Sequence, residues 1–170
     1  MKIKHQLKKE NSSTEIIRAQ RNYPEMARYV KSIYDSNIAA LHGCEISVEE
    51  FDEMLHSNDN DEENYLIIWN DAPVAWLKLN GLLNSSCGWI SMLAVLPNMH
   101  RKGIGKWAIE FAERRFKQLE KKQILLKTTK DNLKAQSFYI SNGFKIKESI
   151  VYKTSDGIKH DGYIFKKQIS

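Results

Sequence analysis

Apolar residues recur along the chain with two different periods, and these periods divide it into predicted strands and helices. Alternation at every second position, or a short continuous apolar run, is typical of a strand, whereas spacings of three and four are typical of a helix. The pattern predicts a first core strand over residues 15–20 and a helix that begins at Pro24, because proline suits the first helical turn. A second helix is predicted to begin at Ser47, since Ser47 and Glu50 have the spacing of a capping box. Residues 37–44, between the two helices, are predicted to be irregular.

The rest of the chain is predicted to form an antiparallel meander, followed by an alternation of helices and strands. The expected elements are a polar, acidic loop over 57–64, strands over 65–69, 74–79 and 88–95, a helix over 103–122, a strand over 124–129, a helix over 132–142, and a terminal hairpin over 144–153 and 158–169. This order predicts an α/β fold with a mixed sheet and about four helices, in a single domain over residues 15–170. Residues 1–14 are expected to be a lead-in segment or an extra edge strand.

Composition is that of a soluble globular protein. Apolar residues make up 42% and charged residues 28%, which is ordinary for such a domain. No apolar run reaches the roughly 20 residues of a membrane span, and the basic N-terminus lacks the apolar core of a secretory signal. The net charge of +5 comes from scattered residues, whereas nucleic-acid binders gather charge on one face. We expect no membrane partner, no nucleic-acid partner and, with only Cys44 and Cys87 as cysteines, a cytoplasmic location.

A glycine-rich turn joins the third strand of the meander to the long helix, and it has the features of an anion site. Gly103 and Gly105 lie where the helix begins. Free backbone N–H groups and the helix dipole both favour negative charge at such a point. Three basic side chains add full positive charges: Arg101, Lys102 and Lys106. The sequence therefore predicts that this turn holds a phosphate or pyrophosphate.

Two common phosphate-binding motifs fit the turn poorly. A nucleotide P-loop needs Ser or Thr after its Gly-Lys pair, but Trp107 follows Lys106, and His100 stands at the first glycine position. The dinucleotide fingerprint is formally matched from Gly103 to Ala108. That motif belongs near the start of a parallel sheet, whereas the strands before this turn have an antiparallel pattern. A dinucleotide-binding protein stays open as a remote alternative.

The turn resembles the acetyl-CoA-binding motif of the GCN5-related N-acetyltransferase (GNAT) superfamily, V-x-P-x-x-[RQ]-x-x-G-x-[GA]. It matches at Val95, Pro97, Gly103 and Gly105, and it departs at His100, where the family has Arg or Gln. A second family motif, N-x-x-A-x-x-x-Y-x-x-x-G-F, is matched downstream by Asn132, Ala135, Tyr139, Gly143 and Phe144. The two motifs, joined by a helix and then a strand, make the resemblance specific. It implies a GNAT-like acyl-CoA N-acyltransferase fold, whose mostly antiparallel sheet splays where the cofactor arm lies.

The resemblance also implies the cosubstrate, acetyl-CoA, and its binding residues. Backbone N–H groups from Arg101 to Lys106 would bind the pyrophosphate. The strand edge at Leu93, Ala94 and Val95 would pair with the pantetheine arm, much as an added strand would. The remaining cofactor contacts implied by the motifs are His100, Lys102, Gly103, Ile104, Gly105, Asn132, Ala135, Phe138 and Tyr139. Asn132 has a second interpretation, as an ordinary helix N-cap.

Acetyl transfer to an amine needs an oxyanion contact, an acid and a base. By resemblance, the backbone N–H of Val95 stabilises the oxyanion and Tyr139 protonates the departing thiolate. On spacing alone, a core aromatic residue is the favoured interpretation of Tyr139. Many relatives carry a catalytic carboxylate on the strand before the turn, but this chain has Ser91 and Met92 there. Three base or substrate candidates lie in the first helical region: His42, Glu45 and Glu49.

The acceptor is only broadly specified. We expect a primary amine of a small molecule, with a peptide amine as the second option. The acidic run in residues 59–63 would attract a polyamine or is simply a solvated loop, and His160 is predicted to be a surface residue. Because the base position is empty, a non-catalytic acetyl-CoA sensor stays open as a different class of function. Family members are often homodimers, and the terminal hairpin is the contact that this analogy suggests.

Overall fold

The structure is a computed structural model that describes residues 2–3, 14–18, 25–56, 59–83 and 86–169 of the 170-residue chain. Its centre is an eight-stranded sheet in the order β1-β2-β3-β4-β5-β6-β8-β7. The strands are β1 (Lys2–Ile3), β2 (Thr14–Arg18), β3 (Glu62–Trp69), β4 (Ala72–Asn80), β5 (Cys87–Val95), β6 (Gln123–Thr129), β7 (Lys145–Lys153) and β8 (Lys159–Gln168). Neighbouring strands run antiparallel except β5 and β6, which are parallel. The predicted α/β class with a mixed sheet is confirmed.

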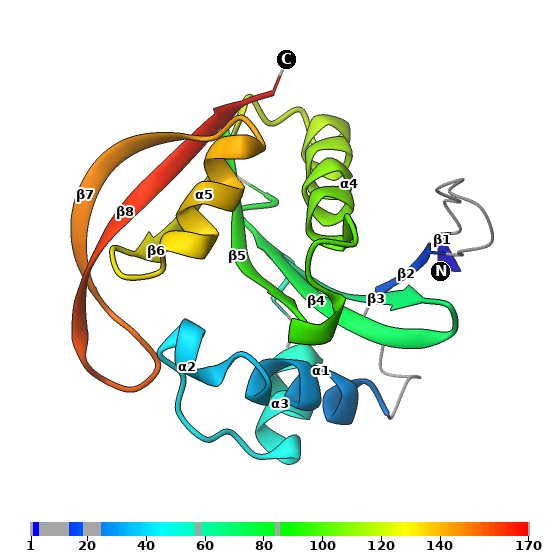
Figure 1. Ribbon diagram of the computed structural model, residues 1–170. Coiled ribbons are helices and arrows are strands. Elements are labelled where there is room, and N and C mark those ends of the chain that lie inside the picture. The colour runs from blue at the N-terminus through cyan, green and yellow to red at the C-terminus, as the bar shows by residue number, and fades with distance from the viewer. Residues whose placement is uncertain (1, 4–13, 19–24, 57–58, 84–85, 170) are drawn as a thin grey trace.

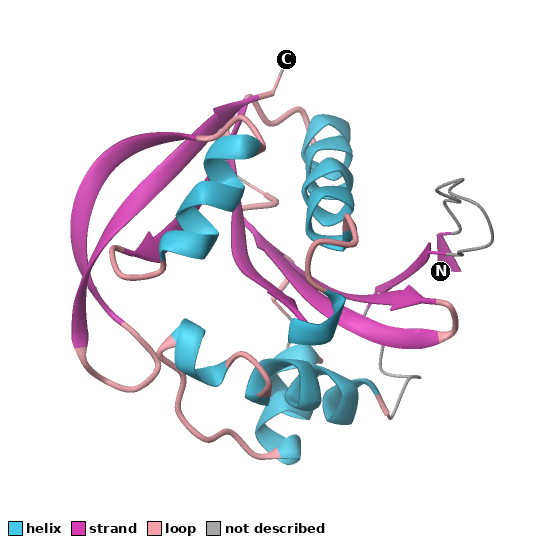
Figure 2. Cartoon of the chain, viewed as in Figure 1, coloured by secondary structure: helices cyan, strands magenta, loops and turns pink. Residues whose placement is uncertain are grey.

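Helices cover both faces of the sheet and form two separate apolar cores (Figure 2). They are α1 (Met26–Asp35), α2 (Ile38–Leu41), α3 (Val48–Leu55), α4 (Ile104–Gln118) and α5 (Leu133–Ser141), and a 3-10 turn, η1 (Pro97–Met99), follows β5. On one face, α1 and α3 pack on residues such as Trp76 and Ala94. On the other face, α4 and α5 pack on a larger core that includes Leu77 and Phe165. The two faces therefore have different coverings.

The sheet splays between its two central parallel strands. The pairing of β5 with β6 is confined to Cys87–Trp89 and Gln123–Leu125. Beyond Trp89 the two strands diverge, and β7 and β8 curve away with β6 while α5 packs inside the curve (Figure 1). The gap opens toward the C-terminal ends of β5 and β6. This is the splay that the resemblance predicted.

Gly88 holds the closed end of this gap. A Cβ atom at Gly88 would lie 2.3 Å from the ring of Phe116, a fully buried residue of α4. The absence of a side chain at Gly88 therefore lets α4 pack directly on β5 where β5 pairs with β6.

We predict that Gly88→Ala lowers the free energy of unfolding by about 2 kcal/mol, because overpacking forces the helix and the strand apart. Chemical denaturation would measure it. Phe116→Leu, which makes room at the same place, is the partner in a double-mutant cycle. Because the two residues touch, the double variant is expected to lose less free energy of unfolding than the two single variants lose together. Additive losses would show that Gly88 and Phe116 are not coupled.

The structure corrects several predicted boundaries. Residues 37–44, expected to be irregular, contain the single-turn helix α2. The expected acidic loop ends early, because β3 begins at Glu62 and buries Glu63 and Asn64. The helix expected to reach residue 122 ends at Gln118, and Glu120 takes a left-handed conformation (φ 57°) just beyond it. The capping box at Ser47 is confirmed.

Some predictions fall on residues outside the described ranges. These include Pro24 as a helix start, most of the segment 1–14, the last residues of the strand expected over 15–20, and positions 57–58 of the acidic loop. Within the first segment, Lys2 and Ile3 pair with Ile17 and Ile16 of β2. At the other edge of the sheet, the hairpin β7–β8 exposes Ile146, Val151 and Ile158. The homodimer contact suggested for this hairpin stays a prediction.

Candidate functional site

The turn after η1 presents a row of backbone N–H groups. Arg101 and Gly103 both have positive φ angles, 61° and 86°, so the backbone alternates in handedness as it enters α4. Alternation of this kind makes a concave nest of N–H groups that suits an anion. Gly103 is the N-cap, and the first intrahelical bond runs from Trp107 N to Gly103 O at 2.9 Å. The amides in the first turn of α4 thus have no acceptor within the helix.

The two sequence motifs meet at Gly105. A Cβ atom there would lie 3.0 Å from Cζ of Phe138, which belongs to α5. Glycine thus lets the second motif's helix approach the first turn of α4. The glycine turn and the helix that carries Tyr139 therefore lie in contact, although the sequence separates them by a helix and a strand.

The open edge of β5 carries the polar groups predicted to pair with the cofactor arm. β5 has a bulge at Ser91, because Leu79 faces Ile90 while Lys78 faces Met92. Leu96 N donates to Val74 O on β4, and successive residues of a strand direct their polar groups to opposite sides. The backbone groups of Leu93 and Val95 therefore point into the gap beside β6.

His100, the departure from the family motif, folds back onto this edge. Its Nε2 lies 2.9 Å from Val95 O, and the side chain of Asn37 donates to the same oxygen at 3.1 Å. His100 was expected to contact the cofactor in place of Arg or Gln. In this structure its side chain contacts the strand edge, while the basic side chains of the turn are Arg101, Lys102 and Lys106.

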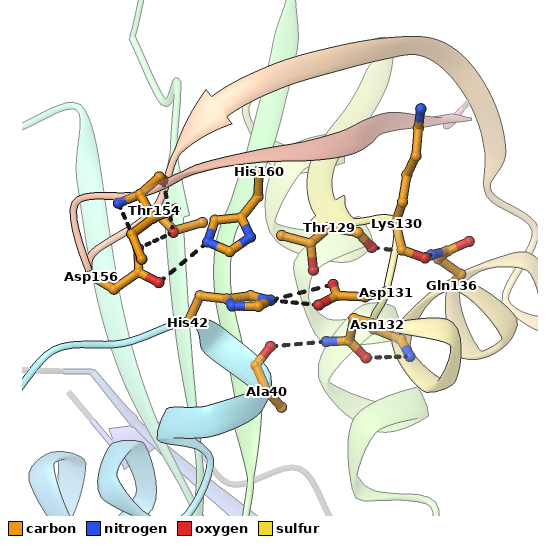
Figure 3. A network of polar contacts seen from close by, with 12 residues as sticks. Ala40, His42, Thr129, Lys130, Asp131, Asn132, Gln136, Thr154, Asp156 and His160 are labelled. Atoms are coloured by element: carbon orange, nitrogen blue, oxygen red, sulfur yellow. Dashed lines mark hydrogen bonds and ion pairs between the residues drawn. The ribbon is translucent and has the colours of Figure 1, made fainter.

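Asn132 has the N-cap role that its position predicted. Its Oδ1 accepts from Ala135 N at 3.1 Å, which starts α5. Its Nδ2 also donates to Ala40 O at 3.1 Å (Figure 3). Because Asn37 bonds to Val95 on β5 and Ala40 bonds to Asn132 after β6, the α2 segment crosses the mouth of the gap.

Tyr139 lies on the inner face of α5. Its ring packs on Phe138, Phe144 and Phe165, with centroid distances of 5.3, 5.8 and 6.1 Å. Burial, together with the nearby Tyr152, raises the pKa of Tyr139 to about 12. The side chain is therefore a protonated phenol at neutral pH.

A network of His and Asp residues lies beside the α2 segment (Figure 3). Nε2 of His42 lies 3.0 Å from Asp131 Oδ2, and Nε2 of His160 lies 3.2 Å from Asp156 Oδ2. The two imidazole rings stack with centroids 4.0 Å apart. Asp156 N donates to His42 O at 3.0 Å, which fixes the β7–β8 turn against α2.

The sequence matches a known protein family over a range that contains both motifs. A sequence model described as the acetyltransferase (GNAT) family matches residues 25–144. The chain belongs to the GNAT family. Among curated proteins no sequence matches this GNAT chain.

Solved structures place the fold in the same family. The ribosomal-protein-S18-alanine N-acetyltransferase from Escherichia coli is 21% identical with a TM-score of 0.69, covering 92% of this chain and 94% of that one. The spermidine N-acetyltransferase from Vibrio cholerae, solved with CoA and spermine, is 18% identical with a TM-score of 0.74, covering 91% and 95%. An N-acetyltransferase from Staphylococcus aureus Mu50 is 13% identical with a TM-score of 0.76, covering 93% and 99%. This GNAT protein is accordingly an acetyl-CoA-dependent acyltransferase.

The fold of this GNAT protein brings only one of the predicted base candidates to the gap. His42 lies at the C-terminal end of α2, beside Asp131. Glu45 is exposed before α3, and Glu49 lies with Asp52, Glu53 and His56 along an outer groove between α1 and α3.

None of the described helices has both the length and the apolar composition of a membrane-spanning helix.

Sequence analysis missed three residues of the network, because it assigned no site role to Asp131 or Asp156 and predicted that His160 is a surface residue. The side chains of Asp156 and His160 are only 22% and 21% exposed. They lie more than a hundred positions after His42 and share no motif with it, so no local pattern could have joined them.

Proposed function

We propose that this GNAT protein transfers the acetyl group of acetyl-CoA to a primary amine of a small molecule. The amine would attack the thioester directly in a ternary complex. The observation that supports this most is the gap between β5 and β6, which has the N–H nest at Arg101–Lys106 beside it and Tyr139 on the adjoining helix. A cosubstrate with a pyrophosphate, a peptide-like arm and a thioester fits that order of groups.

The cofactor residues divide between the two ends of this gap. The amides from Arg101 to Lys106, with Gly103 and Gly105 among them, would bind the pyrophosphate at the start of α4. The backbone of Leu93 and Val95 would pair with the amides of the arm. Residues of the second motif complete the wall of the site: Asn132, Ala135, Phe138 and Tyr139.

The chemistry uses a backbone donor and a phenol. As the amine adds to the carbonyl carbon, the N–H of Val95 would stabilise the oxyanion. When the C–S bond breaks, Tyr139 would give its proton to the thiolate and then take the remaining ammonium proton. The raised pKa of Tyr139 keeps that proton available at neutral pH.

The acceptor is proposed to be a cation before it reacts. Asp131 and Asp156 place carboxylates on the side of the gap that α5 does not cover, and both have lowered pKa values, so both are ionised. Solved relatives of this fold are named for a small polyamine in one case and for a protein alanine in another. A small-molecule amine is our first choice because the α2 segment narrows the mouth of the gap.

The test is release of free thiol from acetyl-CoA with a panel of amines: polyamines, aminoglycosides, amino acids and peptides. Turnover with a small primary amine is the expected result. Turnover with peptides alone would mean that the acceptor is a peptide amine and not a small molecule. Tight CoA binding without turnover across the whole panel would instead support a sensor.

The anion site gives a separate prediction, for Gly103→Val. Gly103 has a φ of 86°, which a β-branched residue adopts only with strain, and a side chain there would disturb the N–H nest. We expect the Kd for CoA, measured by calorimetry, to rise at least tenfold. Gly157→Val is the matched control, because Gly157 has a similar φ of 81° but lies in the β7–β8 turn. Equal losses in both variants would argue against the nest as the pyrophosphate site.

A further inference from the structure

Segments from three parts of the chain hold His42 in one position. It ends α2 in the left-handed conformation, with φ 48° and ψ 47°, which is uncommon for a residue with a side chain. On one side, both carboxylate oxygens of Asp131 lie within 3.3 Å of its Nε2. On the other side, its backbone oxygen accepts from Asp156 N and its ring stacks on His160. The left-handed conformation is common where a helix ends, and the contacts on both sides then fix where the His42 side chain lies.

The contact with Asp131 determines which nitrogen of His42 is free. Thr129 has the largest effect and lowers the pKa of Asp131, burial opposes it, and His42 lowers the pKa further, so the carboxylate is ionised and only accepts hydrogen bonds. Nε2 of a neutral His42 must therefore carry the hydrogen. The lone pair is then on Nδ1, the nitrogen that does not face Asp131.

The β7–β8 turn also holds the His42 ring in place, through Asp156 and His160. Asp156 Oδ1 accepts from Thr154 Oγ1 at 2.6 Å and from Ile158 N at 2.9 Å, which leaves Oδ2 for His160 at 3.2 Å. His160 in turn lies against the His42 ring (Figure 3). Each link of this chain is a short contact between described residues, so the turn fixes the plane of the His42 ring.

His42 lies on the side of the sheet opposite Tyr139. Leu126 and Phe165 pair across β6 and β8 and belong to the core under α5. Thr129 lies an odd number of positions from Leu126, so it faces the other way, as does its partner Gly162. The ring of Tyr152 lies over Gly162 on that same outer face. Burial and then the charge of Asp131 raise the pKa of Tyr152, and Tyr152 adds to the burial that raises the pKa of Tyr139. A molecule in the gap would have the phenol on one side and the His42 network on the other.

We propose that His42 is the general base for the acceptor amine and that Asp131 is its positioning residue. This inference rests on the proposed acetyl transfer. An ammonium acceptor gives one proton to Nδ1 of His42, the amine nitrogen forms its bond to the acetyl carbon, and the C–S bond breaks. The thiolate takes the Tyr139 proton, and Tyr139 recovers one from the new N–H₂ group. His42 then releases its proton to water, so the balance is one proton per acetyl group.

The first experiment compares His42→Ala with wild type, using the best amine of the panel in a buffer with EDTA. We expect kcat to fall about 100-fold, at the lower end of the roughly 10²- to 10⁴-fold that general base catalysis contributes. The Kd for CoA is expected to change less than twofold, and added imidazole is expected to restore part of the lost rate. An unchanged kcat, or a loss that imidazole does not reduce, would overturn the proposal.

His56→Ala is the matched control. His56 also pairs with an aspartate, since its Nδ1 lies 3.1 Å from Asp52 Oδ1, but it ends α3 away from the gap. Its kcat is expected to equal that of wild type. A similar fall in both variants would mean that the His42 effect is not specific to this site.

The role of Asp131 has its own spectroscopic signature. In wild type, ¹⁵N NMR is expected to show His42 with its hydrogen on Nε2, and Asp131→Asn is expected to disturb that tautomer and lower kcat without changing the Kd for CoA. A His42 tautomer with its hydrogen on Nδ1 in wild type would contradict the assignment.

Two outcomes separate this inference from others. Wild type that binds CoA but acetylates no amine would contradict the proposed function, whereas active wild type with active His42→Ala would contradict only the base assignment.

One atom from each of His42, Asp156 and His160 lies within 4.8 Å of the others, close enough for a shared divalent cation. Activity that EDTA abolishes and Zn²⁺ restores would replace the base with a metal.

Discussion

Replacing Tyr139 with phenylalanine is expected to lower kcat at least tenfold, and by as much as a hundredfold, while the Kd for CoA changes little. General acid catalysis typically contributes about 10²- to 10⁴-fold, so a hundredfold loss lies at the lower end of that range. The ring of Tyr139 is held by Phe138, Phe144 and Phe165, so phenylalanine should keep the packing and remove only the hydroxyl. Thiol release under saturating acetyl-CoA and amine would measure kcat.

The pH dependence of this effect follows from the pKa of about 12 that burial gives Tyr139. The acid form exists below the pKa, so its contribution is expected to be constant from pH 7 to pH 10. The ratio of wild-type to Tyr139→Phe kcat should therefore not change over that range. Tyr29→Phe, which removes a hydroxyl that donates to Glu25 on the surface of α1, is the control and should be as active as wild type. Near-wild-type turnover of Tyr139→Phe would leave Tyr139 as a core aromatic residue.

Local patterns in the sequence were enough to predict most of the sheet. The strands from β3 to β6 and the hairpin β7–β8 lie where alternation or continuous apolar runs placed them. Those strands are long and one or both of their faces are buried, so burial imposes a clear period on the sequence. The single turn of α2 is too short to impose a period, and its place is fixed by contacts with Val95 and Asn132 from other elements.

The candidate site divides in the same way. The proposed cofactor side comes from two contiguous motifs, and each motif determines its own backbone conformation: Gly103 provides a positive φ and Asn132 caps α5. The proposed acceptor side is formed by α2, the start of α5 and the β7–β8 turn. Contacts between segments so far apart depend on how the sheet curves, which no local pattern records. Of the candidates chosen for the acceptor side, only His42 was placed there by the fold.

The acidic run was the clearest failure of local reasoning. Four carboxylates among polar residues have the composition of a solvated loop or of a surface for polycations. The structure gives three of them partners from other elements, since Asp61 accepts from Gly81 and Leu83, Glu62 pairs with Lys78, and Glu63 is buried beside Arg115, whereas the exposed Asp59 accepts from the Asp61 amide within the loop. Composition could not show this, because the partners come from β4, its following loop and α4.

Among these four carboxylates, Glu63 is the one whose loss is expected to lower stability most. Its side chain is 2% exposed and accepts from Arg115 at 2.7 and 2.8 Å, from Arg18 at 2.9 Å, and from Tyr65. Burial alone would raise the pKa of Glu63, but hydrogen bonds from Arg115 and Tyr65 and the charge of Arg18 lower it overall. Its contribution to stability is therefore present at neutral pH and is lost only as the pH falls through the lowered folded-state pKa.

Glu63→Gln is expected to lower the free energy of unfolding at pH 7 by about 2–4 kcal/mol. Breaking a buried ion pair leaves the partner charge without compensation, and the value is reduced here because Arg115 is 28% exposed to water. Urea denaturation would measure it. Glu148→Gln, in the exposed pair with Lys147, is the control and should cost less than about 1 kcal/mol. Equal losses in the two variants would mean that Glu63 contributes no more than a surface carboxylate. Combining Arg115→Met with Glu63→Gln should recover part of the lost free energy of unfolding, because it removes the uncompensated charge.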